Sequence, residues 1–148
     1  MTDHEPMGHT MTKDEWRAFL AAGTRTAKLA TVRTDGRPHV APVWFVLDGE
    51  DIILTTGAGT VKARNMAADD RVSLCVDDEV PPFGFVVVHG RAELSGDPAE
   101  LRDWAERIGG RYMGEDRAAE FGARNGVPGE LLVRVKPERV VAEAGVAD

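Results

Sequence analysis

The chain has 148 residues, of which 43% are hydrophobic and 29% are charged, a composition that fits one globular domain with its own core. The formal net charge of −7, with no basic stripe to offset it, argues against a nucleic-acid-binding protein. Cys75 is the only cysteine, which excludes a disulfide framework within the chain and favours a reducing compartment.

Residues 1–11 are polar, and they contain no apolar segment of the kind that a signal peptide requires. No later run approaches the roughly 20 apolar residues that cross a bilayer. We therefore expect a cytoplasmic protein with no membrane partner, in which residues 1–11 form a flexible tail and residues 12–148 form a single domain. His4 and His9 lie in this tail without a third ligand nearby, so the sequence predicts no metal site.

A helix follows the tail. Thr12 and Glu15 have the spacing of a capping box, in which each side chain accepts a hydrogen bond from the backbone of the other residue. Trp16 and Leu20 then fall on one helical face, and Gly23 marks the end of the helix.

The next segments predict three strands, over residues 27–33, 38–47 and 51–56. Each connection contains an Asp-Gly pair, first Asp35-Gly36 and then Asp48-Gly49, and such pairs favour tight hairpin turns. The pattern therefore predicts an antiparallel meander.

The strand over residues 38–47 is apolar on both faces, because positions 40, 42, 44 and 46 and positions 43, 45 and 47 are all apolar. Such a strand has no solvent face, so both faces must contact protein or a ligand. Pro42 cannot donate to a ladder, which indicates a sheet edge or a bulge at this point.

The second half of the chain predicts three further strands and three helices. Gly90 suggests a bulge in its strand, Gly109-Gly110 are expected to end the longest helix, and Pro137 is expected to interrupt the last strand. The helices are expected over about residues 60–68, 97–108 and 115–124, and the strands over about residues 71–77, 85–94 and 130–141.

About six antiparallel strands with few helices are too many for one flat open sheet in a chain of this size. Closure into a small barrel removes the unpaired edges. The sequence therefore predicts a mainly β fold, a six-stranded antiparallel β-barrel with peripheral helices.

The segment Gly57-Ala58-Gly59-Thr60-Val61-Lys62 is the strongest candidate for an anion site. It matches neither a dinucleotide-binding fingerprint nor a P-loop. Thr60 can cap a helix whose first N–H groups and positive dipole end face an anion, with Lys62 and Arg64 beside it. The alternative is a capped helix with two solvated cations.

No catalytic side chain is predicted. His39 and His89 have no carboxylate or nucleophile at a telling spacing, and no G-x-S-x-G motif exists. Cys75 is expected to be a half-buried structural thiol, and Trp44 could be a plain core residue.

Seven segments form a pattern that is specific in its order and spacing: Leu29-Ala30-Thr31-Val32, Asp35-Gly36-Arg37-Pro38-His39, Val43-Trp44-Phe45, Lys62-Ala63-Arg64-Asn65-Met66, Asp70-Arg71-Val72-Ser73, Gly90-Arg91-Ala92-Glu93-Leu94 and Val135-Lys136-Pro137-Glu138-Arg139-Val140. Together they resemble the flavin/deazaflavin oxidoreductases, the split β-barrel proteins related to pyridoxamine 5′-phosphate oxidase. The resemblance is dense from residue 14 to residue 94 and looser around the final strand.

The resemblance implies a homodimer of split barrels with the cofactor in a groove between the subunits. It also implies that the strand around Trp44 lines the cofactor ring, that Thr55 and Thr56 contact its edge or ribityl chain, and that Lys62 holds the phosphate. Thr60 stands where relatives often carry arginine, which implies that phosphate binding either is weaker here or is shared with Arg64. The implied cofactor-binding residues are Ala41, Pro42, Val43, Trp44, Thr55, Thr56, Thr60, Val61, Lys62, Arg64 and Asn65.

The Lys-x-Arg-Asn element and the short chain resemble the group that uses the deazaflavin coenzyme F420 more than the FMN oxidases. The implied function is an F420-dependent oxidoreductase. It would pass hydride from C5 of the reduced coenzyme to an electron-poor small molecule such as an enone, quinone or tetrapyrrole. Two alternatives stay open: an FMN-binding oxidase or electron carrier, and a non-catalytic F420-binding protein.

Overall fold

An antiparallel sheet is the central element of the described chain, which runs from residue 8 to residue 147 of this computed structural model. Its eight strands include seven joined in the order β3-β2-β6-β7-β8-β5-β4, and β1 pairs with the end of β8. The strands are β1 (His9–Thr10), β2 (Ala27–Val32), β3 (Pro38–Val43), β4 (Val46–Asp48), β5 (Asp51–Gly57), β6 (Arg71–Asp78), β7 (Gly84–Ser95) and β8 (Glu130–Ala144). The helices are α1 (Lys13–Ala21), α2 (Val61–Ala68), α3 (Pro98–Met113) and α4 (Ala118–Asn125), with a 3-10 turn over Glu115–Arg117.

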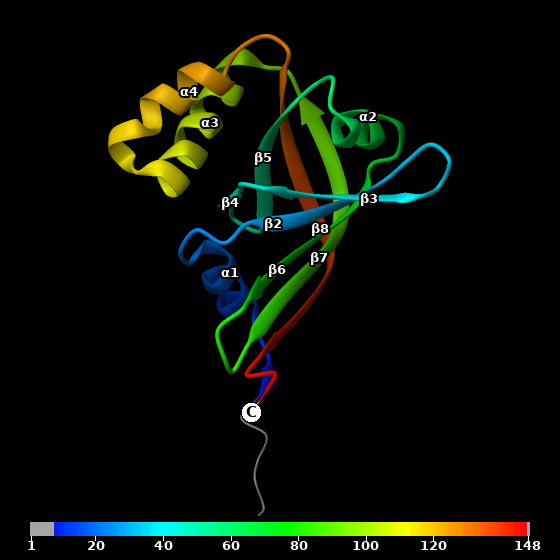
Figure 1. Ribbon diagram of the computed structural model, residues 1–148, viewed down its shortest axis with the longest axis vertical. Helices are drawn as coiled ribbons and strands as arrows, with labels where there is room; N and C mark the ends of the chain where they lie inside the picture. Colours follow the sequence, from blue (N-terminus) through cyan, green and yellow to red (C-terminus); the bar gives the residue numbers. More distant parts are fainter. Residues whose placement is uncertain (1–7, 148) are drawn as a thin grey trace, which may run out of the picture.

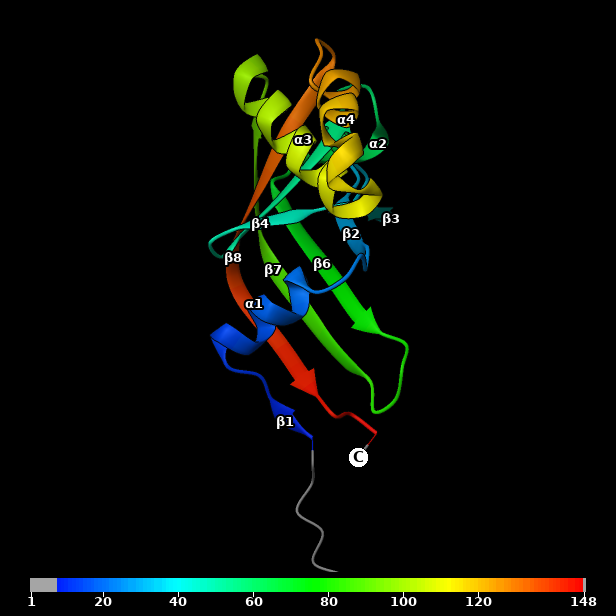
Figure 2. The same ribbon diagram turned by 90° about the vertical axis from the view of Figure 1, so that its left-hand side faces the viewer.

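Figure 1 shows β7 and β8 as long strands along the length of the molecule, crossed by β2, β3 and β4. The α3–α4 pair and α2 lie on opposite sides of the upper part of the sheet, and α1 lies below β2. After a quarter turn, the α3–α4 pair is seen at the top and α1 lies in front of the lower strands (Figure 2).

Alternating burial along the strands builds the main core, as the sequence pattern predicts. Val72, Leu74 and Val76 of β6 are buried, while the residues between them are half-buried. Trp16 and Leu20 of α1 belong to the same core. The predicted capping box of α1 is confirmed by two reciprocal hydrogen bonds, of 3.0 and 3.2 Å, between Thr12 and Glu15.

The helix α3 packs on the other face of the sheet. Leu101 and Trp104 form a second cluster with Ile53 of β5 and Leu132 of β8. Leu54, the next residue of β5, belongs to the main core, so β5 is covered on both faces. This packing brings the α3–α4 pair close to the end of β5.

The predicted continuous strand over residues 38–47 is wrong, because the chain bends after Val43. Trp44 and Phe45, which we call the seam, separate β3 from β4, and these two strands lie at opposite ends of the strand order. An apolar run does not distinguish one strand from two strands that meet at a bend. Of the two alternatives predicted for Pro42, a sheet edge or a bulge, the structure shows the edge, because among the described strands β3 pairs with β2 alone.

The seam also shows how strongly the sheet curls. Three residues of chain span at most about 10 Å, so the two ends of the strand order approach each other at Trp44 and Phe45. The described residues form eight strands where six were predicted, because β1 forms and the long strand divides. The strands β3 and β4 share no ladder, so closure into a barrel stays a prediction.

The helix α3 does not end at Gly109-Gly110 as predicted, but continues to Met113. A Cβ at Gly109 would collide with Phe121 of α4, so this glycine permits close helix packing instead of ending the helix. The helix ends at Gly114, whose φ of +101° favours glycine.

The predicted bulge at Gly90 is confirmed, since the register between β7 and β8 shifts between His89 and Gly90. A Cβ at Gly90 would collide with the Lys136 carbonyl oxygen. Pro137, expected to break the last strand, lies opposite this bulge, and β8 continues through it to Ala144.

His9 and Thr10, which were predicted to lie in a flexible tail, instead pair with Ala144 and Glu143 of β8. Residues 1–7, including His4, lie outside the described residues. Within the described chain, no helix is both long and apolar enough to cross a membrane.

Candidate functional site

A pocket of about 310 Å³ lies where the end of β3, the end of β5, the start of α2 and the α3–α4 pair meet. We call it the Trp44 pocket. It is lined by Pro42, Val43, Trp44, Thr55, Thr56, Gly57, Thr60, Lys62, Ile108 and Asn125. Seven of the eleven predicted cofactor-binding residues are therefore brought together here, from three separate elements.

One wall of the pocket is formed by the turn from β5 into α2. Thr60 is the N-cap of α2, as predicted, and its hydroxyl accepts a hydrogen bond from Ala63 N–H at 3.3 Å. The same hydroxyl donates to the Gly57 carbonyl oxygen at 2.8 Å and lies 3.0 Å from the Thr56 hydroxyl. The first N–H groups of a helix have no intrahelical acceptor, so this end of α2 favours an anion.

Three cations surround the start of α2. Lys62 lines the Trp44 pocket, while Arg64 and Arg33 line a neighbouring pocket of about 320 Å³. Within residues 8–147, none of the three forms an ion pair, whereas Arg91 and Arg134 each contact two carboxylates. Asp35 also lines the neighbouring pocket, so that lining carries two cations and one anion, whereas Lys62 is the one charged residue that lines the Trp44 pocket.

The remaining predicted residues occupy different positions. Val61 and Asn65 line the neighbouring pocket with Arg64. Asn65 is buried and donates a 3.0 Å hydrogen bond to the Thr31 hydroxyl, which ties α2 to β2. Ala41 lies on β3 opposite Leu29 and lines neither pocket.

Trp44 is not a plain core residue, because 38% of its surface is exposed. Its ring stacks on Tyr112 of α3, with 4.9 Å between the centroids and 3° between the planes. Phe121 of α4 contacts the indole at an angle of 59°. The indole therefore forms an aromatic wall of the pocket, supported by both helices.

Ile108, Tyr112 and Asn125 belong to this region and were not predicted from the sequence. Ile108 is one of the buried residues of α3, and helical spacing of apolar residues does not reveal which part of the protein such a face contacts. Burial raises the pKa of Tyr112, against the opposing effects of a hydrogen bond from the Phe45 N–H and the charge of Arg111. Its hydroxyl therefore keeps its proton at neutral pH.

A larger cavity, of about 520 Å³, lies elsewhere, where β2, β3, β6, β7 and β8 meet. Ser73 and His89 line it, and the serine hydroxyl lies 2.7 Å from His89 Nδ1. Glu138 also lines it but contacts Arg91, so within the described chain no carboxylate orients the histidine as hydrolase chemistry requires. His39 Nδ1 is buried and makes no hydrogen bond within the described residues. Burial raises the pKa of the half-buried Cys75, as is typical of a structural thiol.

Comparison with known proteins identifies the family. A family profile described as pyridoxamine 5′-phosphate oxidase matches residues 12–143. An F420H2-dependent biliverdin reductase of Mycobacterium tuberculosis is 32% identical over 142 residues, which cover 94% of this chain and 93% of that protein. A 5a,11a-dehydrotetracycline/5a,11a-dehydrooxytetracycline reductase of Streptomyces rimosus is 40% identical over 74 residues, 45% of this chain and 52% of that protein.

The fold agrees with this assignment. The crystal structure of a conserved hypothetical protein of Mycobacterium tuberculosis is similar to this chain with a TM-score of 0.80 and 28% identity, over 91% of this chain and 86% of that one. The resemblance inferred from the seven sequence segments is thus confirmed, and the chain belongs to the pyridoxamine 5′-phosphate oxidase family.

Proposed function

We propose that the protein is an F420-dependent reductase that transfers hydride from the reduced coenzyme to an electron-poor, conjugated small molecule. The observation that carries this proposal is the Trp44 pocket, which is lined both by the exposed indole of Trp44 and by Lys62 at the start of α2, a lysine without an ion pair among residues 8–147. The biliverdin reductase relative, similar over 94% of this chain, supports F420 as the coenzyme.

The residues present fit a flat, anionic cofactor. Trp44 and Pro42 offer apolar surface for a ring system, and Thr55 and Thr56 offer hydroxyls for its polar edge. Lys62 and the first N–H groups of α2 would hold the phosphate, with Arg64 reinforcing the positive potential from the neighbouring pocket.

The chemistry assigned to the chain itself is orientation and charge placement. When bound, the reduced deazaflavin supplies a hydride at C5, and the side chains around it hold the ring and exclude water. The proton that accompanies the hydride is assigned to solvent, and no side chain is given a catalytic role. The two relatives are named as reductases of biliverdin, a tetrapyrrole, and of dehydrotetracyclines, which are polycyclic. These names support an enone, quinone or tetrapyrrole as acceptor.

We further propose that the active form is a homodimer with the cofactor near the subunit interface. The register places Pro42, Lys28, Cys75, Val87 and Val141 in one row across five strands, on the sheet face opposite the main core. Only Lys28 in this row is charged. Val40, in the next row, is 65% exposed and shares that row with Ala30, Ser73, His89 and Arg139, so the apolar surface is a narrow band with an exposed valine at one end.

Substitution of Val87→Asp tests this interface, because a carboxylate would be buried in the centre of the apolar row. Light scattering coupled to size-exclusion chromatography should show a dimer for the wild-type chain and a monomer for the variant. A wild-type chain that stays monomeric at all concentrations would remove the dimer from the proposal.

The proposed cofactor is tested by fluorescence titration of the apo-protein with F420 and, separately, with FMN. Tighter binding of F420 is expected. Tighter binding of FMN would favour the alternative of an FMN-dependent oxidase or electron carrier, and binding of neither would mean that this family member has lost its cofactor site.

Turnover is tested by following the oxidation of reduced F420 with biliverdin, a quinone and a cyclic enone as acceptors. Acceptor-dependent oxidation is expected for at least one of the three classes. F420 binding without oxidation by any of them would favour the non-catalytic F420-binding protein.

A further inference from the structure

The seam lacks the strand partners that satisfy the backbone elsewhere in the sheet. The strand β3 ends at Val43 and β4 begins at Val46, so Phe45 lies outside both ladders. The Phe45 side chain is fully buried, and buried backbone N–H and C=O groups require hydrogen-bond partners. Two consecutive residues at the end of α3, Arg111 and Tyr112, provide them.

Arg111 joins the seam to the end of α1. Its guanidinium donates to the Phe45 carbonyl oxygen at 2.7 Å, to the Leu20 carbonyl oxygen at 2.7 Å and to the Gly23 carbonyl oxygen at 3.0 Å. It also lies 4.6 Å above the Phe45 ring. Burial lowers the pKa of Arg111, and within residues 8–147 its polar contacts are to carbonyl oxygens. Such a group stabilises the backbone by joining carbonyl groups of the seam and of the end of α1.

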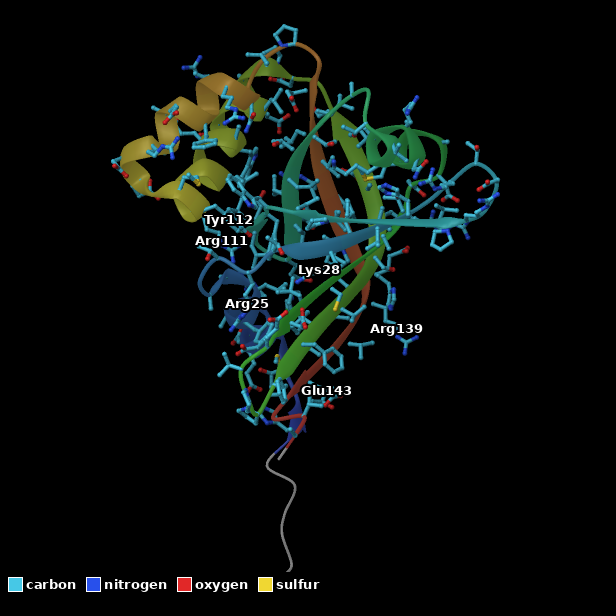
Figure 3. The ribbon with its side chains drawn as sticks, viewed as in Figure 1. Arg25, Lys28, Arg111, Tyr112, Arg139 and Glu143 are labelled. Atoms are coloured by element: carbon cyan, nitrogen blue, oxygen red, sulfur yellow. The ribbon has the colours of Figure 1, made fainter. Side chains whose placement is uncertain are left out.

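Tyr112 holds both residues of the seam. Its hydroxyl accepts a hydrogen bond from the Phe45 N–H at 3.3 Å and donates to the Arg25 carbonyl oxygen at 2.8 Å. The ring of the same side chain stacks flat on Trp44. Figure 3 shows Arg111 and Tyr112 together at the end of the helical pair, with Arg25 below them.

We propose that Arg111 and Tyr112 are positioning residues that hold Trp44 in the orientation in which it binds the cofactor ring. One indole face is covered by Tyr112 while 38% of the residue stays exposed, so the stack fixes the indole without removing it from the pocket. A fixed aromatic wall lowers the ordering cost of binding a flat ligand. This proposal rests on the proposed function, in which Trp44 contacts that ring.

The test combines fluorine NMR of 5-fluorotryptophan-labelled protein with F420 titration. The chain has three tryptophans, and Trp44→Phe assigns the signal of Trp44. Trp16 and Trp104 are buried in two separate clusters, so their unchanged signals report an intact fold. The variants are Tyr112→Phe, which keeps the stack but removes the hydroxyl, Tyr112→Leu, which removes both, and Arg111→Gln.

A matched control is Arg102→Gln, because Arg102 is an exposed arginine on the same helix that does not contact the seam. The control is expected to leave the Trp44 signal and the F420 affinity unchanged. Tyr112→Phe should weaken F420 binding about 3- to 10-fold, the factor that one lost hydrogen bond represents. Tyr112→Leu should displace or broaden the Trp44 signal and weaken binding more than Tyr112→Phe does.

An unchanged Trp44 signal in Tyr112→Leu would overturn the positioning role, and so would a displaced signal with full F420 affinity. If Tyr112→Leu or Arg111→Gln disturbs the Trp16 and Trp104 signals, the fold of that variant has changed. The test then depends on Tyr112→Phe, which retains the ring. Full F420 affinity in Tyr112→Phe would overturn the proposal. If the wild-type chain binds no F420, the proposed function fails, and the Trp44 signal alone decides whether Tyr112 holds the indole.

Discussion

The two walls of the Trp44 pocket differ in how they are built. The wall at the start of α2 comes from residues close together in the sequence, Thr55 to Lys62, and offers hydroxyls and a cation. The opposite wall joins Trp44 to Ile108 and Asn125, which lie more than 60 positions further along the chain, and is mainly apolar and aromatic. The charged wall depends on a local turn, and the aromatic wall depends on the packing of α3 and α4.

This difference assigns separate roles to the two walls. Charge at a helix start attracts an anionic group and gives binding that weakens as salt screens it. An aromatic wall gives shape and ring orientation, and these depend little on salt. Perturbing one wall should therefore change affinity through charge, and perturbing the other through packing.

The largest effect is expected from Lys62→Ala. A hydrogen bond to a charged group contributes about 1.5–3 kcal/mol, so F420 binding should weaken about 10- to 100-fold, as measured by fluorescence titration. The matched control is Lys13→Ala, which also removes a lysine from a first helical turn, that of α1. Equal affinity of Lys62→Ala and the wild-type chain for F420 would mean that this wall does not bind the phosphate.

Gly109→Ala tests the packing of the aromatic wall. The added Cβ would collide with Phe121, and overpacking of this kind costs about 1–3 kcal/mol of unfolding free energy. Denaturant unfolding should detect this loss, while Gly96→Ala, where a Cβ meets no atom within 4 Å, should be nearly neutral. Equal stability of the two variants would show that α3 and α4 can separate without cost.

Arg64→Ala is expected to have a smaller effect on F420 binding than Lys62→Ala, because Arg64 lines the neighbouring pocket. An indirect, solvent-screened contribution is worth less than about 1 kcal/mol. Titrations at low and high salt should therefore show a loss of less than about fivefold, largest at low salt. A loss equal to that of Lys62→Ala would mean that both cations contact the same anion.

The smallest effect lies outside the pocket, at the start of α1. A hydrogen bond from the Thr12 N–H, together with one from His9, lowers the pKa of Glu15 from 4.5 to about 2. The stabilisation by ionised Glu15 is therefore present above pH 4.5 and is lost as the pH falls toward 2. The protection of the Thr12 amide, measured as its exchange rate relative to the intrinsic rate at the same pH, should therefore fall over this range, and Glu15→Gln should remove that change in protection. Identical pH profiles for the wild-type chain and Glu15→Gln would contradict the lowered pKa of Glu15.

A local pattern predicted the start of α2 correctly, because a helix cap depends on residues within one turn of each other. Thr60 was predicted to cap α2, and Lys62 to lie beside that cap, from the order of residues alone. The prediction that Gly109 ends α3 is wrong because the role of this glycine depends on a distant residue. It packs against Phe121 of α4, which follows only after the next turn of the chain. The division of residues 38–47 was missed because an apolar run carries no signal for a bend.

By itself, the sequence determined the mainly β character and the cap of α2, since these follow from alternation and capping. The family, and with it most residues of the Trp44 pocket, followed from the resemblance of seven segments to known proteins. Only the tertiary structure decided that Trp44 and Phe45 form a seam and that Arg111 and Tyr112 provide the hydrogen-bond partners of the Phe45 backbone. The hydrogen bonds of a strand break can be met by any part of the chain that packs there. Which part does so is decided by the packing of the whole core.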